Sequence, residues 1–262
     1  MRNDVFPDTD SRYVARRAAS FGRRAADYAR ERPDYPDAAV RWALEPVASR
    51  TPPRVLDLGA GTGKLTEVLL RTGVPAEAIT AVEPDPDMLA ELRRRVPGVR
   101  AEAGSAEEIP LDDGAVDAVL VGQALHWFDM DRALPQIVRV LAPGGVLAAL
   151  WNLDDDRVPW VAGLKRAARS RVSFENWRSK IALPSVPPFG PELRREFPHA
   201  QRRTAASMVA TIATHSHVLV LDDAERAALL ARVRDYLDAT PETADGEFDL
   251  PIVTIALRAV RS

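Results

Sequence analysis

Residues 54–63, Arg54-Val-Leu-Asp-Leu-Gly-Ala-Gly-Thr-Gly63, decide the fold of this 262-residue chain. Val55, Leu56 and Leu58 form a short apolar run, which is typical of a strand buried on both faces. Residues 59–63 follow at once and are all small. At the carboxyl end of a strand, such residues let the backbone turn tightly and let a ligand approach without a Cβ in its way. The stretch therefore predicts a strand that ends in a ligand-binding turn.

An amphipathic helix and a second strand are expected directly after this turn. Thr62 can cap the helix, and Gly73 lies where the helix would stop. The second strand covers residues 79–82 and ends in Glu83. A strand, a glycine turn, a helix, a strand and an acid, in that order, form one half of a nucleotide-binding βαβ unit.

The parts of this unit predict its ligand. The helix N-terminus offers free N–H groups and the positive end of a dipole to anionic or carboxylate-bearing groups. Glu83 lies at the tip of the neighbouring strand, where a carboxylate can accept both hydroxyl hydrogens of a ribose. We therefore expect an adenosine-like ligand across the strand tips.

Three glycine motifs compete for this stretch. A phosphate-binding P-loop needs glycine at position 58 and a hydroxyl at position 65, where the chain has Leu58 and Leu65. A dinucleotide site needs G-x-G-x-x-G, and Lys64 replaces its third glycine. The pattern that remains is D-x-G-x-G-x-G over residues 57–63.

The composition limits the class of protein. Hydrophobic residues make up 46% and charged residues 28% of the chain, as in ordinary soluble globular proteins. We expect a cytoplasmic protein without membrane segments, because there is no long apolar run and no secretory signal. The absence of cysteine excludes disulfides and thiolate metal sites, and we expect no metal. A net charge of −3 without a basic stripe argues against a nucleic-acid substrate.

Strands and helices alternate through much of the remaining chain, which predicts a parallel sheet with right-handed crossovers. Further strands are expected at 99–103, 115–121, 146–151, 197–205 and 252–259, and further helices at 37–48, 86–95, 131–141, 158–171, 206–214 and 222–237. Pro143-Gly-Gly145 is expected to stop the helix at 131–141. Ala227, Leu230, Val233 and Leu237 are expected on the buried face of the last helix.

Polar residues follow the predicted third and fourth strands. Ser105 and Glu107 are suitable partners for an adenine, while Ser105 with Glu108 also matches the capping box of a short helix. Gln123 and His126 follow the fourth strand, which we expect beside the first. These two side chains should therefore face the crevice where ligands bind in such sheets.

The N-terminal segment leaves two possibilities open. Residues 11–31 have helical spacing and are followed by Pro33. They predict either a helix packed on the sheet or a flap whose Tyr28, Arg32 and Tyr35 border the ligand. In the second case Arg32 could grip a carboxylate of the ligand through two hydrogen bonds.

Together these motifs resemble a known family. The glycine stretch is followed by Ala81-Val-Glu-Pro-Asp85, Gly104-Ser-Ala-Glu107, Gln123-Ala124 with His126-Trp-Phe128, and Arg139-Val-Leu-Ala-Pro-Gly-Gly145 with Trp151-Asn152. They resemble successive motifs of the class I S-adenosylmethionine-dependent methyltransferases, of the methyltransferase type 11 branch that is similar to trans-aconitate methyltransferases. The resemblance is specific from about residue 20 to 160 and thin over 161–250.

The resemblance implies a fold and a cofactor. The fold is α/β and Rossmann-like, with a mostly parallel seven-stranded sheet, helices on both faces and an antiparallel C-terminal strand. Residues 1–50 would form an N-terminal helical flap and residues 51–262 the methyltransferase domain, in which 161–250 supply substrate-side insertions and helices. The cofactor would be S-adenosylmethionine.

The same resemblance implies which residues contact the cofactor. Asp57 would help hold its amino group, Glu83 its ribose hydroxyls, and Gln123 would line its methionine side. The full set of expected cofactor-binding residues is Tyr28, Arg32, Asp57, Gly59, Ala60, Gly61, Thr62, Gly63, Glu83, Pro84, Met88, Ser105, Ala106, Glu107 and Gln123.

The expected activity is methyl transfer to a small-molecule acceptor. His126 is the candidate catalytic base, which is needed only if the acceptor carries a proton at neutral pH; its other possible role is to orient the pocket wall. A nicotinamide-dependent oxidoreductase is an alternative, opposed by Lys64 and by the lack of a Tyr-x-x-x-Lys pair. A non-catalytic S-adenosylmethionine-binding protein also stays open.

Overall fold

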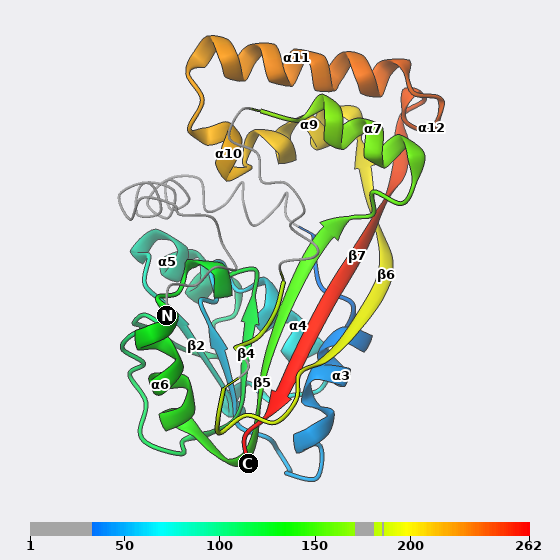
Figure 1. Ribbon diagram of the computed structural model, residues 1–262. Helices are drawn as coiled ribbons and strands as arrows, with labels where there is room; N and C mark the ends of the chain where they lie inside the picture. Colours follow the sequence, from blue (N-terminus) through cyan, green and yellow to red (C-terminus); the bar gives the residue numbers. More distant parts are fainter. Residues whose placement is uncertain (1–32, 171–180, 185) are drawn as a thin grey trace.

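The computed structural model describes residues 33–170, 181–184 and 186–262, and a seven-stranded sheet forms their core (Figure 1). The strand order is β3-β2-β1-β4-β5-β7-β6. The strands are β1 (Val55–Leu58), β2 (Ile79–Glu83), β3 (Arg100–Ala103), β4 (Val116–Gly122), β5 (Leu141–Asp154), β6 (Leu193–Thr204) and β7 (Glu247–Val260).

The first five strands along the chain run parallel, whereas β7 runs antiparallel to both of its neighbours, β5 and β6. This confirms the predicted mostly parallel sheet with an antiparallel C-terminal strand. β4 lies directly beside β1, as expected. The carboxyl ends of β1, β2, β4 and β5 therefore meet at one edge of the sheet.

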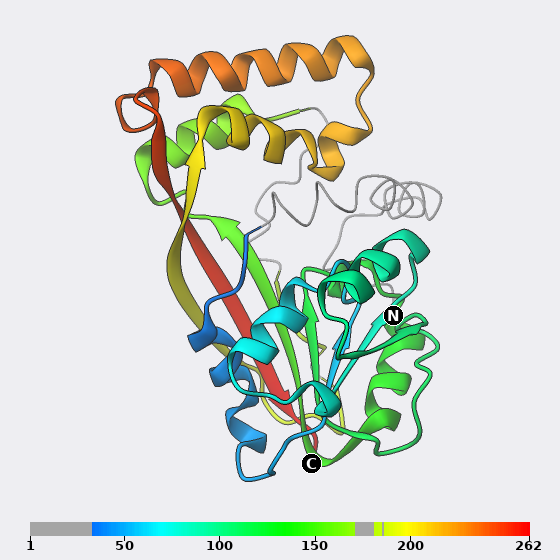
Figure 2. The same ribbon diagram turned by 180° about the vertical axis from the view of Figure 1, so that it is seen from behind.

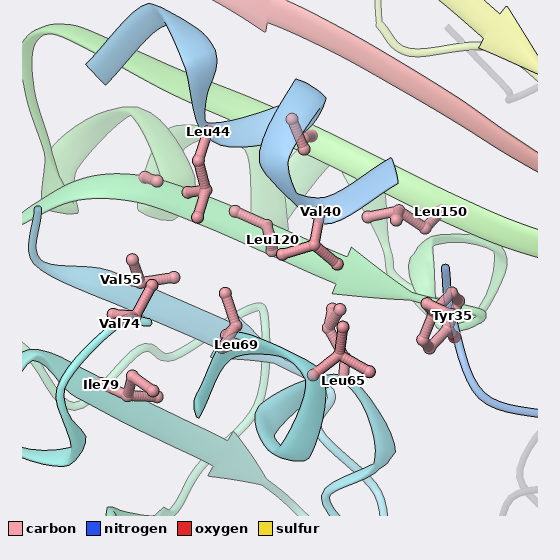
Figure 3. Packing of buried hydrophobic residues seen from close by; sticks show 14 of the residues in the cluster. Tyr35, Val40, Leu44, Val55, Leu65, Leu69, Val74, Ile79, Leu120 and Leu150 are labelled. Atoms are coloured by element: carbon pink, nitrogen blue, oxygen red, sulfur yellow. The ribbon is translucent and has the colours of Figure 1, made fainter. Parts of the chain in front are cut away.

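Helices cover both faces of the sheet. The helices are α3 (Asp37–Leu44), η1 (Glu45–Val47), α4 (Lys64–Arg71), η2 (Ala76–Ala78), α5 (Pro86–Arg95), η3 (Leu125–Trp127) and α6 (Met130–Val140). Val55 and Leu56 are adjacent in β1 and so point to opposite faces. Val55 packs in the cluster that includes side chains of α3 and α4 (Figure 3), and Leu56 in the cluster that includes Ile137 of α6.

A separate layer of helices stands beyond the sheet, at the end of the long antiparallel pair β6 and β7 (Figures 1 and 2). It contains α7 (Pro159–Ala167), α9 (Ala205–Ala213), α10 (Ser216–Leu219), α11 (Asp223–Ala239) and α12 (Pro241–Ala244). Its own apolar cluster joins α7, α9, α10 and α11 to the start of β7. The layer lies at the end of the sheet toward which β4 and β5 point (Figure 1).

The predicted buried face of α11 was partly wrong. Val233 and Leu237 are buried, but the third residue of this face is Leu229. Ala227 is exposed and Leu230 is half-buried. The buried residues of α11 are spaced by four and form one narrow stripe. Other apolar residues are spread around the helix, so sequence periodicity alone does not identify this stripe.

Two further local predictions were wrong. Strand β5 begins at Leu141, directly after α6, so the stretch Pro143-Gly-Gly145 lies inside the strand as an irregularity in its pairing with β4. Residues 105–109 form no helix; Ser105 and Glu108 form an isolated bridge instead.

In the described part of the chain, no helix has the length and apolar character that a membrane span requires.

Candidate active site

The glycine turn after β1 has the conformation that the sequence predicts. Gly59, Gly61 and Gly63 have φ angles of 70°, 57° and 87°, in the left-handed region that favours glycine. A Cβ on Gly59 would lie 2.8 Å from Cβ of Ala124, so the turn is pressed against the segment after β4. Residues 59–63 thus present bare backbone at the edge where the strand tips meet.

Glu83 lies at the tip of β2 and joins that strand to the glycine turn. Its Oε2 accepts a hydrogen bond from the N–H of Gly61 at 2.8 Å, and its Oε1 accepts one from the N–H of Asp85 at 2.9 Å. The side chain is 6% exposed. Burial raises the pKa of this carboxyl, and the two backbone N–H groups oppose that shift.

Asp57 is fully buried on β1. Its Oδ2 accepts a hydrogen bond from Oγ1 of Thr66 at 2.6 Å, while its Oδ1 has no hydrogen-bond partner among the described residues. The pKa of Asp57 is raised to about 7: burial raises it most, the hydrogen bond from Thr66 lowers it, and the nearby charge of Glu83 raises it. Thr66 is a partner that sequence reasoning missed.

Thr62 does not cap the following helix, contrary to the prediction. Gly63 occupies the N-cap position in a left-handed conformation, and no side chain bonds to the first turn of α4. Thr62 is 1% exposed, and among the described residues its Oγ1 has no hydrogen-bond partner. A buried hydroxyl without a partner costs free energy unless a ligand or water satisfies it.

The helix after β2 starts where the sequence predicts. Asp85 caps α5 by accepting hydrogen bonds from the N–H groups of Asp87 and Met88. Met88 is buried, and its sulfur would lie 3.8 Å from a Cβ added to Gly61. Met88 therefore borders the glycine turn, whereas Pro84 is exposed at the strand tip.

The segment after β3 is tied to the segment after β4. Ala106 is buried, and Ser105 and Glu107 are half-buried. The Oε1 of Glu107 accepts a hydrogen bond from the N–H of Asp129 at 2.9 Å, next to the start of α6. Local sequence patterns do not predict this contact, because it joins residues 22 positions apart in the chain.

Gln123 and His126 follow β4 directly. Gln123 has a φ of 57°, and it is the one non-glycine residue in the described part of the chain with a positive φ. Its N–H donates to the carbonyl of Leu150 and its Nε2 to the carbonyl of Asn152, each at 2.9 Å. His126 lies in η3, and its ring centroid is 4.7 Å from that of Trp127.

The described part of the predicted N-terminal flap packs on the sheet. The predicted helix over residues 11–31, which includes Tyr28, lies outside the described residues, and so does Arg32. Tyr35 is buried where β4 ends (Figure 3), with its hydroxyl oxygen 2.7 Å from the position of a Cβ on Gly122. A cavity of about 310 Å³ lies beside this segment, lined by Asp34, Tyr35, Lys64, His199 and Arg202 among others.

Comparison with known proteins agrees with this architecture. The methyltransferase domain family Methyltransf_11 matches residues 56–149, which include the glycine turn, Glu83 and Gln123. An uncharacterised methyltransferase of Mycobacterium tuberculosis is 42% identical over 241 residues, 92% of this chain and 95% of that protein. Trans-aconitate 2-methyltransferase of Methylobacterium nodulans is 32% identical over 228 residues, 80% of this chain and 88% of that protein.

A solved structure shows the same fold. It is provisionally assigned as a type II methyltransferase from Anaeromyxobacter dehalogenans and matches with a TM-score of 0.58 and 28% identity. The match covers 88% of this chain and 97% of that chain. By its relatives and its fold, the chain belongs to the class I S-adenosylmethionine-dependent methyltransferases, in the type 11 branch that is similar to trans-aconitate methyltransferases.

Proposed function

We propose that this S-adenosylmethionine-dependent methyltransferase transfers the methyl group to a small-molecule acceptor by in-line displacement. The name of the 32% identical relative, trans-aconitate 2-methyltransferase, supports a small acceptor. The helical layer beyond the strand tips supports it too, because its helices stand over the end of the sheet where family members bind their ligands (Figure 1). The sequence also lacks the basic excess that is typical of nucleic-acid substrates.

The observation that carries the proposed cofactor site is the position of Glu83. Its carboxylate is buried at the tip of β2 and bonds to the N–H of Gly61 in the glycine turn. Each carboxylate oxygen has two lone-pair sites, so each can accept one more hydrogen bond. We assign the ribose hydroxyls of the cofactor to these free sites.

The unsatisfied groups near the turn fit the rest of the cofactor. Oδ1 of Asp57 has no partner among the described residues, and the cofactor's ammonium group would supply a donor for it, directly or through water. The Oγ1 of Thr62 also has no hydrogen-bond partner among the described residues, and the ligand would supply one. Bare backbone at Gly59, Gly61 and Gly63, with Ala60 between them, allows the close approach that this placement needs.

The adenine would lie between two segments. Ser105, Ala106 and Glu107 would border one side of it, and Met88 with Pro84 the other. Glu107 already holds Asp129 through Oε1, which leaves its second oxygen as an acceptor for the adenine amino group. Gln123 would line the methionine side. Tyr28 and Arg32 stay proposed contacts that the described residues do not include.

When bound, S-adenosylmethionine supplies a methyl group that is already electrophilic, so the protein's main task is alignment. Correct orientation of two reactants contributes roughly 7–11 kcal/mol at best. We propose His126 as the residue that removes a proton from the acceptor. An acceptor that is already a carboxylate anion needs no such base, and His126 would then only shape the pocket wall.

Turnover tests both parts of the proposal. Labelled S-adenosylmethionine would be incubated with the protein and a panel of tricarboxylates, phenols and amines, and methylated product measured by mass spectrometry. The proposal predicts product with at least one of these classes. For a protonated acceptor, His126→Gln should lower kcat by about 10²–10⁴-fold, and for a carboxylate it should leave kcat within a few-fold. Product formed only on protein or nucleic acid would contradict a small-molecule acceptor.

A further inference from the structure

We propose that Asn152 is a positioning residue of the cofactor site, which fixes the wall formed by Gln123 and by the segment before α3. The inference rests on the proposed placement of the cofactor beside Gln123. It concerns a residue whose side chain lies outside that set of cofactor contacts and acts through other groups.

Asn152 sits at a junction of three parts of the chain near the end of β5. Its Nδ2 lies 3.3 Å from the carbonyl oxygen of Pro33 and 3.1 Å from that of Asp34. Its Oδ1 accepts a hydrogen bond from Oγ1 of Thr254 on β7 at 2.5 Å. Its backbone carbonyl accepts the Nε2 of Gln123 at 2.9 Å. One buried residue thus joins β4, β7 and the N-terminal segment.

The directions of these hydrogen bonds are fixed by chemistry. Two carbonyl oxygens can only accept, so the amide nitrogen of Asn152 must face Pro33 and Asp34. The hydroxyl of Thr254 must then donate to Oδ1, and its lone pair is free for Nε2 of His199 at 3.0 Å. The two carbonyls at Nδ2 and the Thr254 hydroxyl at Oδ1 therefore fix the orientation of the Asn152 side chain together.

The second observation is the strained backbone of Gln123. A non-glycine residue at a φ of 57° costs free energy, and such conformations persist only where the surroundings hold them. Both hydrogen bonds that hold Gln123 come from β5, from the carbonyls of Leu150 and Asn152. The position of the β5 tip therefore decides where the Gln123 side chain lies.

The third observation links the same junction to the glycine turn. Nζ of Lys64, the first residue of α4, pairs with Oδ1 of Asp34 at 3.0 Å. Tyr35 packs against Gly122, which precedes Gln123. When Asn152 holds residues 33 and 34, it holds Asp34, the partner of Lys64, and the residue directly before Tyr35. Loss of the hydrogen bonds of the Asn152 side chain should therefore shift the glycine turn and the segment at Gln123, while the apolar core below them stays packed.

The test compares the dissociation constant of S-adenosylhomocysteine, measured by calorimetry, across matched variants. Asn152→Asp keeps the size of the side chain but puts an acceptor against two carbonyls. Thr254→Val removes the hydroxyl that orients Asn152, and Thr254→Ser restores it. Thr243→Val is the matched control, because Thr243 is a buried threonine whose hydroxyl bonds to backbone carbonyls in the helical layer.

We expect Asn152→Asp to weaken binding by about tenfold or more and Thr254→Val by about threefold, the effect of losing one or two oriented hydrogen bonds. Thr254→Ser and Thr243→Val should bind within about twofold of the native chain, whatever their melting temperatures. All measurements are made well below the melting temperature, so that the fraction folded does not enter the affinity.

The possible outcomes separate this inference from the proposed function. If the native chain binds and Glu83→Gln weakens binding, but Asn152→Asp and Thr254→Val bind like the native chain, Asn152 is a structural residue and the inference is wrong. If Thr254→Ser binds as poorly as Thr254→Val, the hydroxyl is not the cause and the inference is again wrong. If the native chain itself does not bind, the proposed cofactor site and this inference fall together.

Discussion

The carboxylate of Glu83 accepts a hydrogen bond from the backbone N–H of Gly61 at 2.8 Å, which fastens the tip of β2 to the glycine turn after β1. The acid that we assign to the ribose is therefore also part of the support of the turn. A change at this residue should affect ligand binding and the shape of the turn together.

Glu83→Gln should weaken binding of S-adenosylhomocysteine. The amide loses the charge and one acceptor, and each hydrogen bond to a charged group is worth about 1.5–3 kcal/mol, or roughly 10- to 150-fold in affinity. Calorimetry measures the change. Glu102→Gln is the matched control, because Glu102 lies on the neighbouring strand and pairs with Arg100. Equal affinity of the Glu83 variant and the native chain would show that another residue holds the ribose.

Gly61→Ala should weaken cofactor binding as well as lower stability slightly. A Cβ at this position has room in the protein, since its nearest neighbour would be the Met88 sulfur at 3.8 Å. The left-handed φ costs about 1 kcal/mol for alanine. The added methyl would occupy the space in which a ligand meets the turn, so affinity should fall by about tenfold or more.

Gly246→Ala is the control for that change. Gly246 also has a positive φ, 85°, and open space around its Cβ position, but it lies between α12 and β7. The two variants should lose similar amounts of stability by chemical denaturation, and only Gly61→Ala should lose affinity. A comparable loss of affinity in both variants would argue against ligand contact at Gly61.

Asp57 should make stability depend on pH in the neutral range. Its folded pKa is about 7, whereas an unfolded aspartate titrates near 3.8. Between these values the folded state binds more protons, so the contribution of Asp57 is present below about pH 4 and is lost as pH rises through 7. Asp57→Asn should therefore gain stability relative to the native chain between pH 5 and pH 8. Thermal unfolding at both pH values measures this change in relative stability, and Asp113→Asn is the control at an exposed aspartate. A stability difference between Asp57→Asn and the native chain that is the same at pH 5 and pH 8 would contradict the raised pKa.

Asp117 should show the opposite dependence. Burial raises its pKa, but hydrogen bonds from Arg54 and Arg50 outweigh that effect and hold the pKa at about 2. Its contribution is therefore present above about pH 4 and is lost as pH falls toward 2. Asp117→Asn should cost about 1–3 kcal/mol of unfolding free energy, because both arginines are partly exposed. The cost should be the same at pH 5 and pH 8, and denaturant titration at the two values checks it.

Local sequence was enough to predict the glycine turn and its flanking elements. The apolar run of β1, the left-handed glycines and the cap at Asp85 each depend on residues within a few positions of one another. Strand and helix alternation then predicted a parallel sheet, with the fourth strand beside the first. The candidate ligand residues at the strand tips follow from that arrangement.

The supports of these residues could not be predicted, because they join different elements whose contacts depend on how the chain packs. Asp57 bonds to Thr66 across the turn, and Asn152 bonds to Thr254, 102 positions away. The hydrogen bond between Glu107 and Asp129 likewise depends on how two loops meet above the sheet. Such contacts arise from packing and leave no periodic signal in the sequence.

The most direct test of the account is a crystal structure of the protein with S-adenosylhomocysteine bound. We expect the nucleoside across the tips of β1 and β2, with both ribose hydroxyls within about 3 Å of the Glu83 carboxylate and the amino-acid part against residues 59–63. A ligand bound elsewhere, or a ribose held by another side chain while Glu83 contacts only Gly61 and Asp85, would contradict it.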